Sequence, residues 1–190
     1  SNETLSELVS SLRKAGVRVI LDGVFNHVGR DFWAFRDVLE HGERSAYCDW
    51  FRGLSFGRRS PYNDPFVYES WNGHHELVEL NLRNPDVREH LFQAIDLWIH
   101  TFDIDGLRLD VAYCMEIDFL QALASFCRGV RPDFWLMGEV VHGDYRTWID
   151  AQTLDSVTNY GCYKGLYSSH VDKNYCEIAY SVNRQFGDQG

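Results

Sequence analysis

The feature of this sequence that most limits its fold is a regular alternation of helix-like and strand-like segments. Residues 3–15 carry leucine and valine at helical spacing, and the run 17–25 is β-branched and apolar enough for a strand buried on both faces. We expect further helices over 85–102, 117–127, 145–151 and 173–186, and further strands over 104–112, 133–140 and 154–160. Such an order is typical of an α/β fold with parallel strands, either a doubly wound sheet or a (β/α) barrel.

Residues 29–80 interrupt this alternation. Apolar periodicity is lost there, and aromatic residues mix with glycine, proline, asparagine and aspartate. A structureless loop of this length is rare in a compact domain unless it is functional. We therefore predict an irregular inserted loop domain over 29–80, with residues 1–28 and 81–190 forming the α/β domain and the aromatic side chains supplying a small core for the insertion.

The net charge argues against some classes of partner, and the spacing of the cysteines argues against disulfide and zinc frameworks. A net charge of −10 without any basic run argues against nucleic acid and against an anionic membrane surface. No apolar run reaches the roughly 20 residues that a membrane helix needs. The five cysteines are widely spaced and contain no CxxC pair, so neither a disulfide framework nor a zinc site is indicated. We expect reduced thiols and a cytoplasmic protein.

Polar side chains gather where the expected strands end, the edge on which parallel α/β folds build their sites. Alternation along 104–112 puts Arg108 and Asp110 on one face, and Glu139 is the last polar residue of the next strand. Because neighbouring strands lie about 4.8 Å apart, the carboxyl groups of Asp110 and Glu139 should approach the roughly 5 to 5.5 Å separation of a retaining glycosidase.

Two carboxyl groups with opposite roles would suit that chemistry. Arg108 would keep Asp110 ionised as a nucleophile, and burial near that charge should raise the pKa of Glu139 into the range of a general acid. The alternative is a structural ion pair between Arg108 and Asp110, with Glu139 as a surface carboxylate.

A third polar cluster follows the strand at 17–25. Asp22, Asn26 and His27 gather at its exit. The imidazole of His27 is suited to hydrogen-bond a sugar hydroxyl, and Asp22 to orient it or to brace Arg108. The alternative is an ordinary turn, since asparagine and glycine favour the positive φ that a strand exit requires.

Three short motifs resemble the signature regions of the α-amylase family, glycoside hydrolase family 13. They are DGVFNH at 22–27, GLRLDVA at 106–112 and GEV at 138–140, and VELNL at 78–82 resembles a fourth. The resemblance implies a partial (β/α)8 barrel, about its third to sixth strand-helix units, with the inserted loop domain after the third strand. It implies Asp110 as nucleophile, Glu139 as general acid/base, Arg108 beside the nucleophile, His27 as a sugar contact and Asp22 as a structural aspartate.

The resemblance also concerns calcium binding and the leaving-group side of the site. No cofactor is required for the chemistry. Asn26 matches a position that often binds calcium in the family, whereas Glu79 stands where many members have a ligating aspartate, and calcium needs six to eight oxygen ligands. His142 resembles a position on the leaving-group side, and a helix cap or an exposed histidine is the alternative. A metal cluster at His74, His75 and Glu76 is not indicated, because no further metal ligand lies at a suitable spacing. We expect these residues in a solvated or sugar-contacting loop.

The family uses a third carboxylate, in an NHD-like motif on the seventh strand, and no such motif follows Glu139. About four strands are found where a closed barrel has eight. We therefore expect a piece truncated at both ends and inactive by itself.

Four functions compete. The first is a retaining hydrolase of α-linked glucose oligosaccharides or polysaccharides, and the segment 68–81, YESWNGHHELVELN, resembles the neopullulanase and cyclomaltodextrinase branch. The second is a transglycosylase with the same glycosyl-enzyme intermediate. The third is a non-catalytic family relative, which need not keep the carboxylates, and the fourth is a nucleotide-binding or sugar-phosphate α/β protein, which lacks support because neither GxGxxG nor GxxxxGK[ST] occurs.

Overall fold

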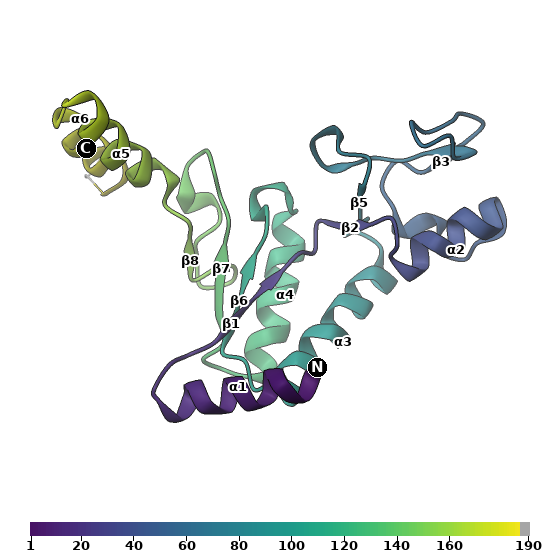
Figure 1. Cartoon of the computed structure of the whole chain (residues 1–190), viewed down its shortest axis with the longest axis horizontal. Helices are drawn as coiled ribbons and strands as arrows, with labels where there is room; N and C mark the ends of the chain where they lie inside the picture. The colour runs from purple at the N-terminus through teal and green to yellow at the C-terminus, as the bar shows by residue number, and fades with distance from the viewer. Residues whose placement is uncertain (187–190) are drawn as a thin grey trace.

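A four-stranded parallel sheet organises the chain (Figure 1). The computed structural model describes residues 1–186. The strand order is β1 (Ile20–Gly23), β6 (Gly106–Leu109), β7 (Trp135–Gly138) and β8 (Ser156–Val157), and each adjacent pair is parallel. The parallel α/β class expected from the sequence is confirmed, although each strand is shorter than the apolar run that contains it.

Three helices expected from the sequence accompany the sheet. They are α1 (Asn2–Lys14), α3 (Pro85–Phe102) and α4 (Ile117–Val130), and α3 packs against both of the others. The N-cap of α3 is Asn84, whose side chain accepts from the Asp86 N–H at 2.8 Å, with Pro85 in the first turn. The apolar residues that recur at intervals of four along α3 are all buried: Val87, Leu91, Ile95 and Ile99.

The two faces of the sheet differ in character. Leu107 lies beside Leu21 and Leu136 in the parallel register, and Leu107 and Leu136 are fully buried. One residue further along, Arg108 lies beside Asp22, and both keep part of their side chains accessible. Alternation of side chains along β6 therefore puts leucine toward the core and the charged groups on the other face.

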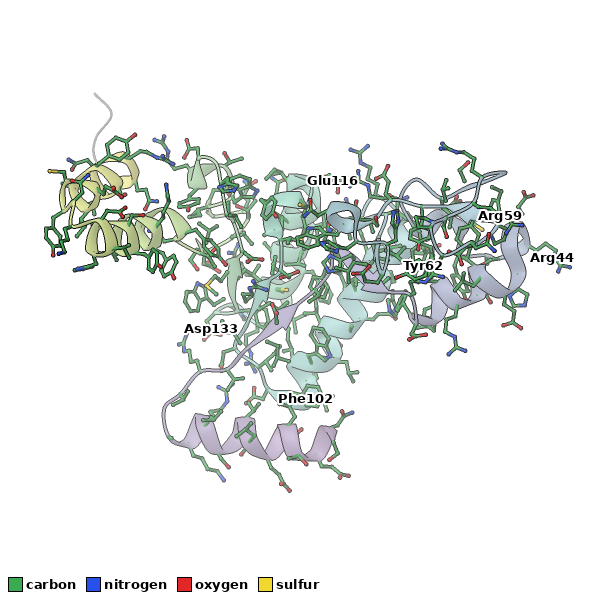
Figure 2. The ribbon with its side chains drawn as sticks, turned by 45° about the horizontal axis from the view of Figure 1, so that its top comes forward. Arg44, Arg59, Tyr62, Phe102, Glu116 and Asp133 are labelled. Atoms are coloured by element: carbon green, nitrogen blue, oxygen red, sulfur yellow. The ribbon has the colours of Figure 1, made fainter. Side chains whose placement is uncertain are left out.

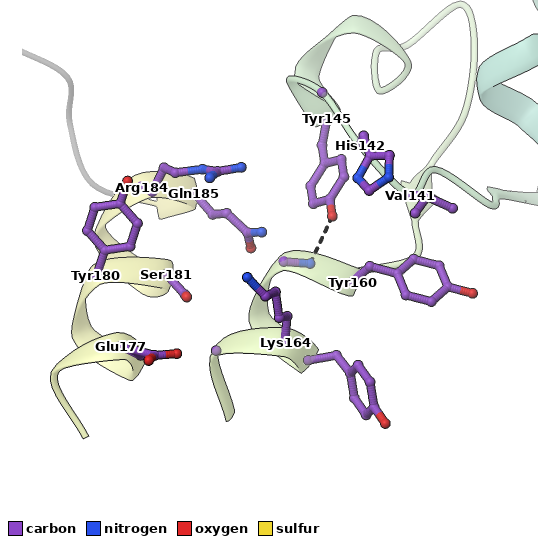
Figure 3. Close-up of a pocket in the computed structure, with 14 residues that line it drawn as sticks. Val141, His142, Tyr145, Tyr160, Lys164, Glu177, Tyr180, Ser181, Arg184 and Gln185 are labelled. Carbon is purple, nitrogen blue, oxygen red and sulfur yellow. Dashed lines mark hydrogen bonds between the residues drawn. The ribbon is translucent and has the colours of Figure 1, made fainter. Parts of the chain in front are cut away.

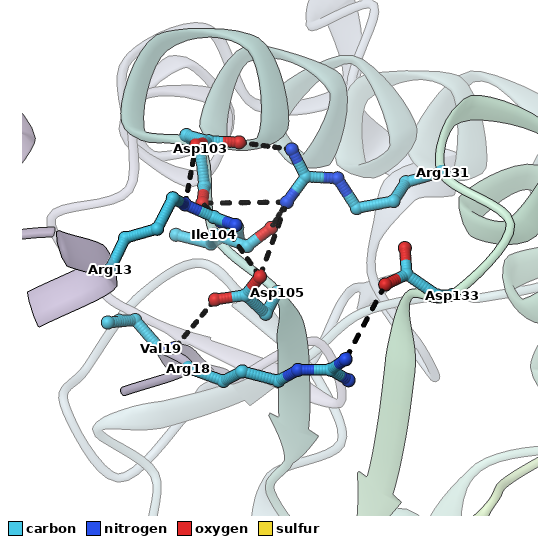
Figure 4. A network of polar contacts seen from close by, with 8 residues as sticks. All are labelled: Arg13, Arg18, Val19, Asp103, Ile104, Asp105, Arg131 and Asp133. Carbon is cyan, nitrogen blue, oxygen red and sulfur yellow. Dashed lines mark hydrogen bonds and ion pairs between the residues drawn. The ribbon is translucent and has the colours of Figure 1, made fainter. Parts of the chain in front are cut away.

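A polar network stabilises the end of the sheet at which the strands begin, opposite to the end that carries Arg108 and Asp22 (Figure 4). Asp105, just before β6, is 8% exposed. Its carboxylate accepts from the Val19 N–H at 2.8 Å and from Arg13 at 2.7 Å, and Arg131 donates to the Ile104 carbonyl at 2.7 Å. These contacts join α1 and the end of α4 to the starts of β1 and β6. They stabilise the N-terminal end of the sheet, whereas the C-terminal end is the edge on which such folds place their sites.

The inserted segment is more regular than the sequence suggests. It contains α2 (Trp33–His41), and the expectation of an irregular chain is wrong there, because WAFRDVLEH buries Ala34, Phe35 and Val38 on one side. Strand β2 (His27–Gly29) pairs antiparallel with β5 (Leu77–Glu79), and β3 (Ser55–Phe56) pairs with β4 (Phe66–Val67). Three short 3-10 helices lie in the inserted segment, η1 (Gly42–Arg44), η2 (Cys48–Trp50) and η3 (Trp71–Gly73), and two more lie after β6 and β7, η4 (Ala112–Cys114) and η5 (Tyr145–Thr147).

Aromatic rings hold this segment together, as expected. Phe35 meets Phe51 and Tyr68 edge to face, with ring centroids 5.1 and 5.0 Å apart. Arg30 pairs with Asp64 at 2.9 Å and lies 4.2 Å over the ring of Tyr62, which Figure 2 labels in the same lobe as Arg44 and Arg59. The division into 1–28 with 81–190 and 29–80 stays a prediction.

The C-terminal part also differs from expectation. The helix expected over 173–186 is confirmed as α6 (Cys176–Phe186), but an additional helix that was not expected, α5 (Tyr160–Asp172), precedes it and ends at Lys173, which has a φ of 56°. The two helices pack closely at Gly165, where an added Cβ would lie 2.3 Å from the Ser181 hydroxyl. The helix expected over 145–151 is reduced to the short η5.

Two further observations concern the residues 1–186. None of their helices combines the length and the apolar character needed to cross a membrane. The five cysteines are free thiols.

Candidate active site

One guanidinium group binds three carboxylates at the C-terminal ends of the strands. Arg108 donates to Asp22 Oδ1 at 2.8 Å and to Asp110 Oδ1 at 2.7 Å, and its Nη2 lies 3.0 Å from Glu139 Oε2. The three acidic residues come from β1 and from the exits of β6 and β7. The predicted contact of Arg108 with Asp110 is confirmed, and so is the bracing of Arg108 by Asp22.

Asp110 and Glu139 bind different nitrogens of this guanidinium, Asp110 at Nη1 and Glu139 at Nη2, and the separation of their carboxyl groups stays a prediction. The Asp110 N–H donates to the Gly23 carbonyl at 3.1 Å, and the Glu139 N–H donates to the Leu109 carbonyl at 2.8 Å. These bonds extend the sheet by one residue past each strand end, which brings the two side chains to one edge. The side chain of Asp110 is 23% exposed and that of Glu139 is 15% exposed, so both remain reachable from one side.

Two more donors hold the Glu139 carboxylate. The Val111 N–H donates to Oε2 at 3.1 Å, and the Tyr160 hydroxyl donates to Oε1 at 2.9 Å. Val111 has a φ of 43°, which is rare for a β-branched residue and marks local strain at a functional position.

These donors overturn one expectation. Burial raises the pKa of Glu139, but the N–H of Val111, the hydroxyl of Tyr160, the guanidinium of Arg108 and a contact with the Asp110 carboxyl together outweigh it. The pKa of Glu139 is therefore lowered from its usual value, whereas the sequence predicted a raised one. The reason is hydrogen bonding to the charged form, which depends on positions that the sequence does not reveal.

His27 lies at the start of β2, 8% exposed, next to the nucleophile candidate. Burial lowers the pKa of its imidazole, and the charge of Asp110 opposes that shift only in part. This lowered pKa favours the neutral imidazole, whose one N–H can donate a hydrogen bond. The ring of Trp71 packs on it with centroids 5.7 Å apart, so the inserted segment fixes the position of this histidine.

The two calcium candidates fit a cation poorly. The Asn26 amide nitrogen lies 3.5 Å from His27 Nδ1. The Glu79 carboxylate faces Arg52 at 3.4 Å, so a guanidinium already neutralises it. Among residues 1–186 no group of three or more histidine, cysteine, aspartate or glutamate side chains is arranged to hold a metal ion. A calcium site stays a prediction without a matching donor set.

His142 lies apart from the carboxylates, exposed on the rim of a pocket (Figure 3). The pocket has a volume of about 760 Å³ and lies between the chain after β7 and the helices α5 and α6. Tyr145, Tyr160 and Lys164 line it with His142. The pocket adjoins Glu139 through Tyr160, and the role of His142 on the leaving-group side stays a prediction. His74 and His75 belong to the inserted segment, where His74 pairs with Glu76.

Sequence reasoning missed Tyr160, Val111 and Trp71. A signal for Tyr160 was present, because it lies at the end of the last predicted strand just as Asp110 and Glu139 lie near the ends of theirs. The part played by the Val111 N–H depends on its backbone conformation, for which a valine gives no signal. The contact of Trp71 with His27 crosses 44 positions of sequence and could not be foreseen.

Comparison with known proteins gives consistent matches. The family model described as "Alpha amylase, catalytic domain" matches residues 1–185. A cyclomaltodextrinase of Geobacillus thermopakistaniensis (strain MAS1) is 37% identical over 161 residues, 83% of this chain and 26% of the relative. Neopullulanase 2 of Thermoactinomyces vulgaris is 37% identical over 160 residues, again 83% and 26%. The ligand-free cyclic alpha-maltosyl-(1→6)-maltose hydrolase from Arthrobacter globiformis matches with a TM-score of 0.88 at 29% identity, covering 97% of this chain and 42% of that one.

These matches confirm the partial (β/α)8 barrel expected from the three motifs, and the likeness of residues 68–81 to the neopullulanase and cyclomaltodextrinase branch agrees with them. The chain spans about a quarter of the length of the curated relatives it matches.

Proposed function

Because this chain belongs to the alpha-amylase catalytic-domain family, we propose that it supplies the nucleophile and the acid/base residue of a retaining glycosidase that cleaves α-linked glucose oligosaccharides. The observation that carries the proposal is the pairing of Asp110 and Glu139 from neighbouring parallel strands on one guanidinium. A structural ion pair would need only one of these carboxylates. Two of them, each 15 to 23% exposed at the same edge of the sheet, are what double displacement requires.

In the first half of the reaction Asp110 attacks the anomeric carbon and forms a bond to it. The glycosidic bond breaks, its electron pair stays on the leaving oxygen, and the proton of Glu139 goes to that oxygen. Arg108 stabilises the negative charge of Asp110 before the attack. The neutral imidazole of His27 donates a hydrogen bond to a hydroxyl of the same sugar.

In the second half Glu139 is a carboxylate, the state that its hydrogen bonds favour in this structure. It takes a proton from water while the water oxygen bonds to the anomeric carbon and Asp110 leaves with its electron pair. A sugar hydroxyl in place of water gives transglycosylation through the same intermediate. The third carboxylate of the family's chemistry is not among the assigned residues.

The substrate class rests on relatives and on the site together. The relatives are a cyclomaltodextrinase, a neopullulanase and a hydrolase of a cyclic maltosyl-maltose. Short or cyclic maltodextrins are therefore the substrates we propose. The free thiols support a cytoplasmic location for the protein.

The test is a reaction of the full-length protein that carries this chain with maltohexaose. Proton NMR of the sugars identifies the anomeric configuration of the first product. We expect the α-anomer as the first product, because two inversions restore the configuration. A first product in the β configuration would rule out the double displacement. Products longer than maltohexaose would assign the protein to the transglycosylases, and shorter products alone to the hydrolases.

A further inference from the structure

The two oxygens of the Glu139 carboxylate are held in different ways. Oε2 accepts from the Val111 N–H and faces Arg108, and both of these groups can only donate. Oε1 accepts from the hydroxyl of Tyr160 at 2.9 Å. A hydroxyl can donate or accept, and it rotates to suit its partner.

The position of Tyr160 is set by the start of α5 and not by the catalytic cluster. Asn159 caps the helix by accepting from the Cys162 N–H at 2.9 Å, and the Gly161 N–H donates to the Tyr145 hydroxyl at 3.0 Å (Figure 3). The ring of Tyr160 is held at its base while the residue stays 38% exposed. It can therefore turn toward or away from Glu139 without disturbing the sheet.

A proton on Oε2 would place a hydrogen against two groups that themselves donate, which is unfavourable. A proton on Oε1 costs only the reversal of one hydroxyl. Oε1 is thus the oxygen that carries the exchangeable proton, and it is the oxygen that Tyr160 covers.

We propose that Tyr160 is a positioning residue for Glu139: its hydroxyl holds Oε1 in the ionised state, and it must reverse or swing away before Glu139 can donate a proton to the leaving group. The inference rests on the proposed function, since it deepens the role of Glu139. The lowered pKa of Glu139, to which this hydrogen bond contributes, agrees with it.

Other charged and titratable groups face the same carboxylate. They are Arg108 on β6, Asp110 after it, Tyr113 on η4 and, through the shared guanidinium, Asp22 on β1. Burial, together with the charges of Glu139 and Asp110, raises the pKa of Tyr113, so Tyr113 is neutral in the range where Glu139 titrates. Arg108 and Asp110 remain in place when Tyr160 is changed, so a change in pH dependence reports on Tyr160 itself.

The test is Tyr160→Phe in the full-length protein, with Tyr167→Phe on the same helix as matched control. Tyr167 is 61% exposed and lies outside the lining of the pocket. The hydroxyl stabilises the charged form of Glu139, so its removal raises the pKa. We expect the basic limb of kcat/KM for maltohexaose to move up by as much as about one pH unit, and the control to leave it unchanged.

A second substrate and a second variant keep the test decisive. With α-maltosyl fluoride the leaving group needs no proton, so Tyr160→Phe should leave its kcat/KM within about twofold of wild type. Replacement of Tyr160 by 3,5-difluorotyrosine, a more acidic phenol and a stronger donor, should move the basic limb down.

The outcomes distinguish failure of the proposed function from failure of the role proposed for Tyr160. A wild-type protein without activity on either substrate would refute the proposed function. An active protein whose pH limb is unchanged in Tyr160→Phe, or whose rates on both substrates fall equally, would overturn the role of Tyr160 and leave the proposed function standing.

Discussion

Replacement of Arg108 by methionine removes the positive charge that three carboxylates share, while it keeps most of the apolar stem. Asp22, Asp110 and Glu139 would then face one another without compensation. Truncating one partner of a fully buried charge pair costs about 3 to 5 kcal/mol, and a surface pair contributes about 0 to 1 kcal/mol. Arg108 is 24% exposed and Asp22 is 57% exposed. We expect a loss of about 2 to 3 kcal/mol in the free energy of unfolding near neutral pH.

The loss should depend on pH with a defined sign. In the wild type the folded-state pKa of Glu139 is lowered, so its contribution to stability is present above the unfolded pKa and is lost as pH falls through the folded pKa. In Arg108→Met the facing carboxylates repel one another, their folded pKa values rise, and protonation relieves the repulsion. The difference in unfolding free energy between variant and wild type should therefore shrink between about pH 7 and about pH 4.

Urea unfolding followed by tryptophan fluorescence at both pH values measures this difference. Arg131→Met is the matched control, because Arg131 is 22% exposed and contacts Asp103 and Asp105 at the opposite end of the sheet. The control should lose stability and keep its kcat, whereas Arg108→Met should lose both. A destabilisation by Arg108→Met that is equal at the two pH values, or larger in acid, would refute the electrostatic account.

Three further predictions concern catalysis, metal and assembly of the barrel. Asp110→Asn should lower kcat by at least about four orders of magnitude while calorimetric binding of maltohexaose persists; near-normal turnover would mean that another residue is the nucleophile. Removal of calcium with EDTA should shift the melting temperature by less than about 2 °C, because Arg52 already neutralises Glu79, and a larger shift would reveal a calcium site. Residues 1–190 expressed alone should release no reducing ends from maltohexaose, because β1 and β8 are open edges of the sheet; specific activity equal to that of the full-length protein would contradict this.

The sequence allows prediction of those parts of the fold in which side-chain period and burial agree. Helix α3 repeats its apolar residues every fourth position, and β6 alternates leucine with charge, so the amino-acid pattern alone is enough to place both. Helix α5 gives no such signal, because it buries only Gly165 and Ser169. Its stability comes from contact with α6 and from its cap, and neither leaves an apolar period in the sequence.

The same limit applies to the site. The residue types and the strand ends predicted the cluster of Arg108, Asp110 and Glu139. The shift in the pKa of Glu139 was predicted in the wrong direction. It depends on the Val111 N–H and on the hydroxyl of Tyr160, which follows the next strand. Burial can be inferred from a pattern, whereas the direction of individual hydrogen-bond donors depends on the folded backbone.

The central claim is that Asp110 is the nucleophile of a retaining reaction, and trapping of the covalent intermediate tests it most directly. Glu139→Gln in the full-length protein slows the second half of the reaction, since no base remains to activate water. After incubation with α-maltosyl fluoride and acid quenching, peptide mass spectrometry should find one maltosyl group, bound to Asp110. A maltosyl group on another residue, or a protein that turns over the fluoride to β-maltose without any covalent adduct, would contradict the account.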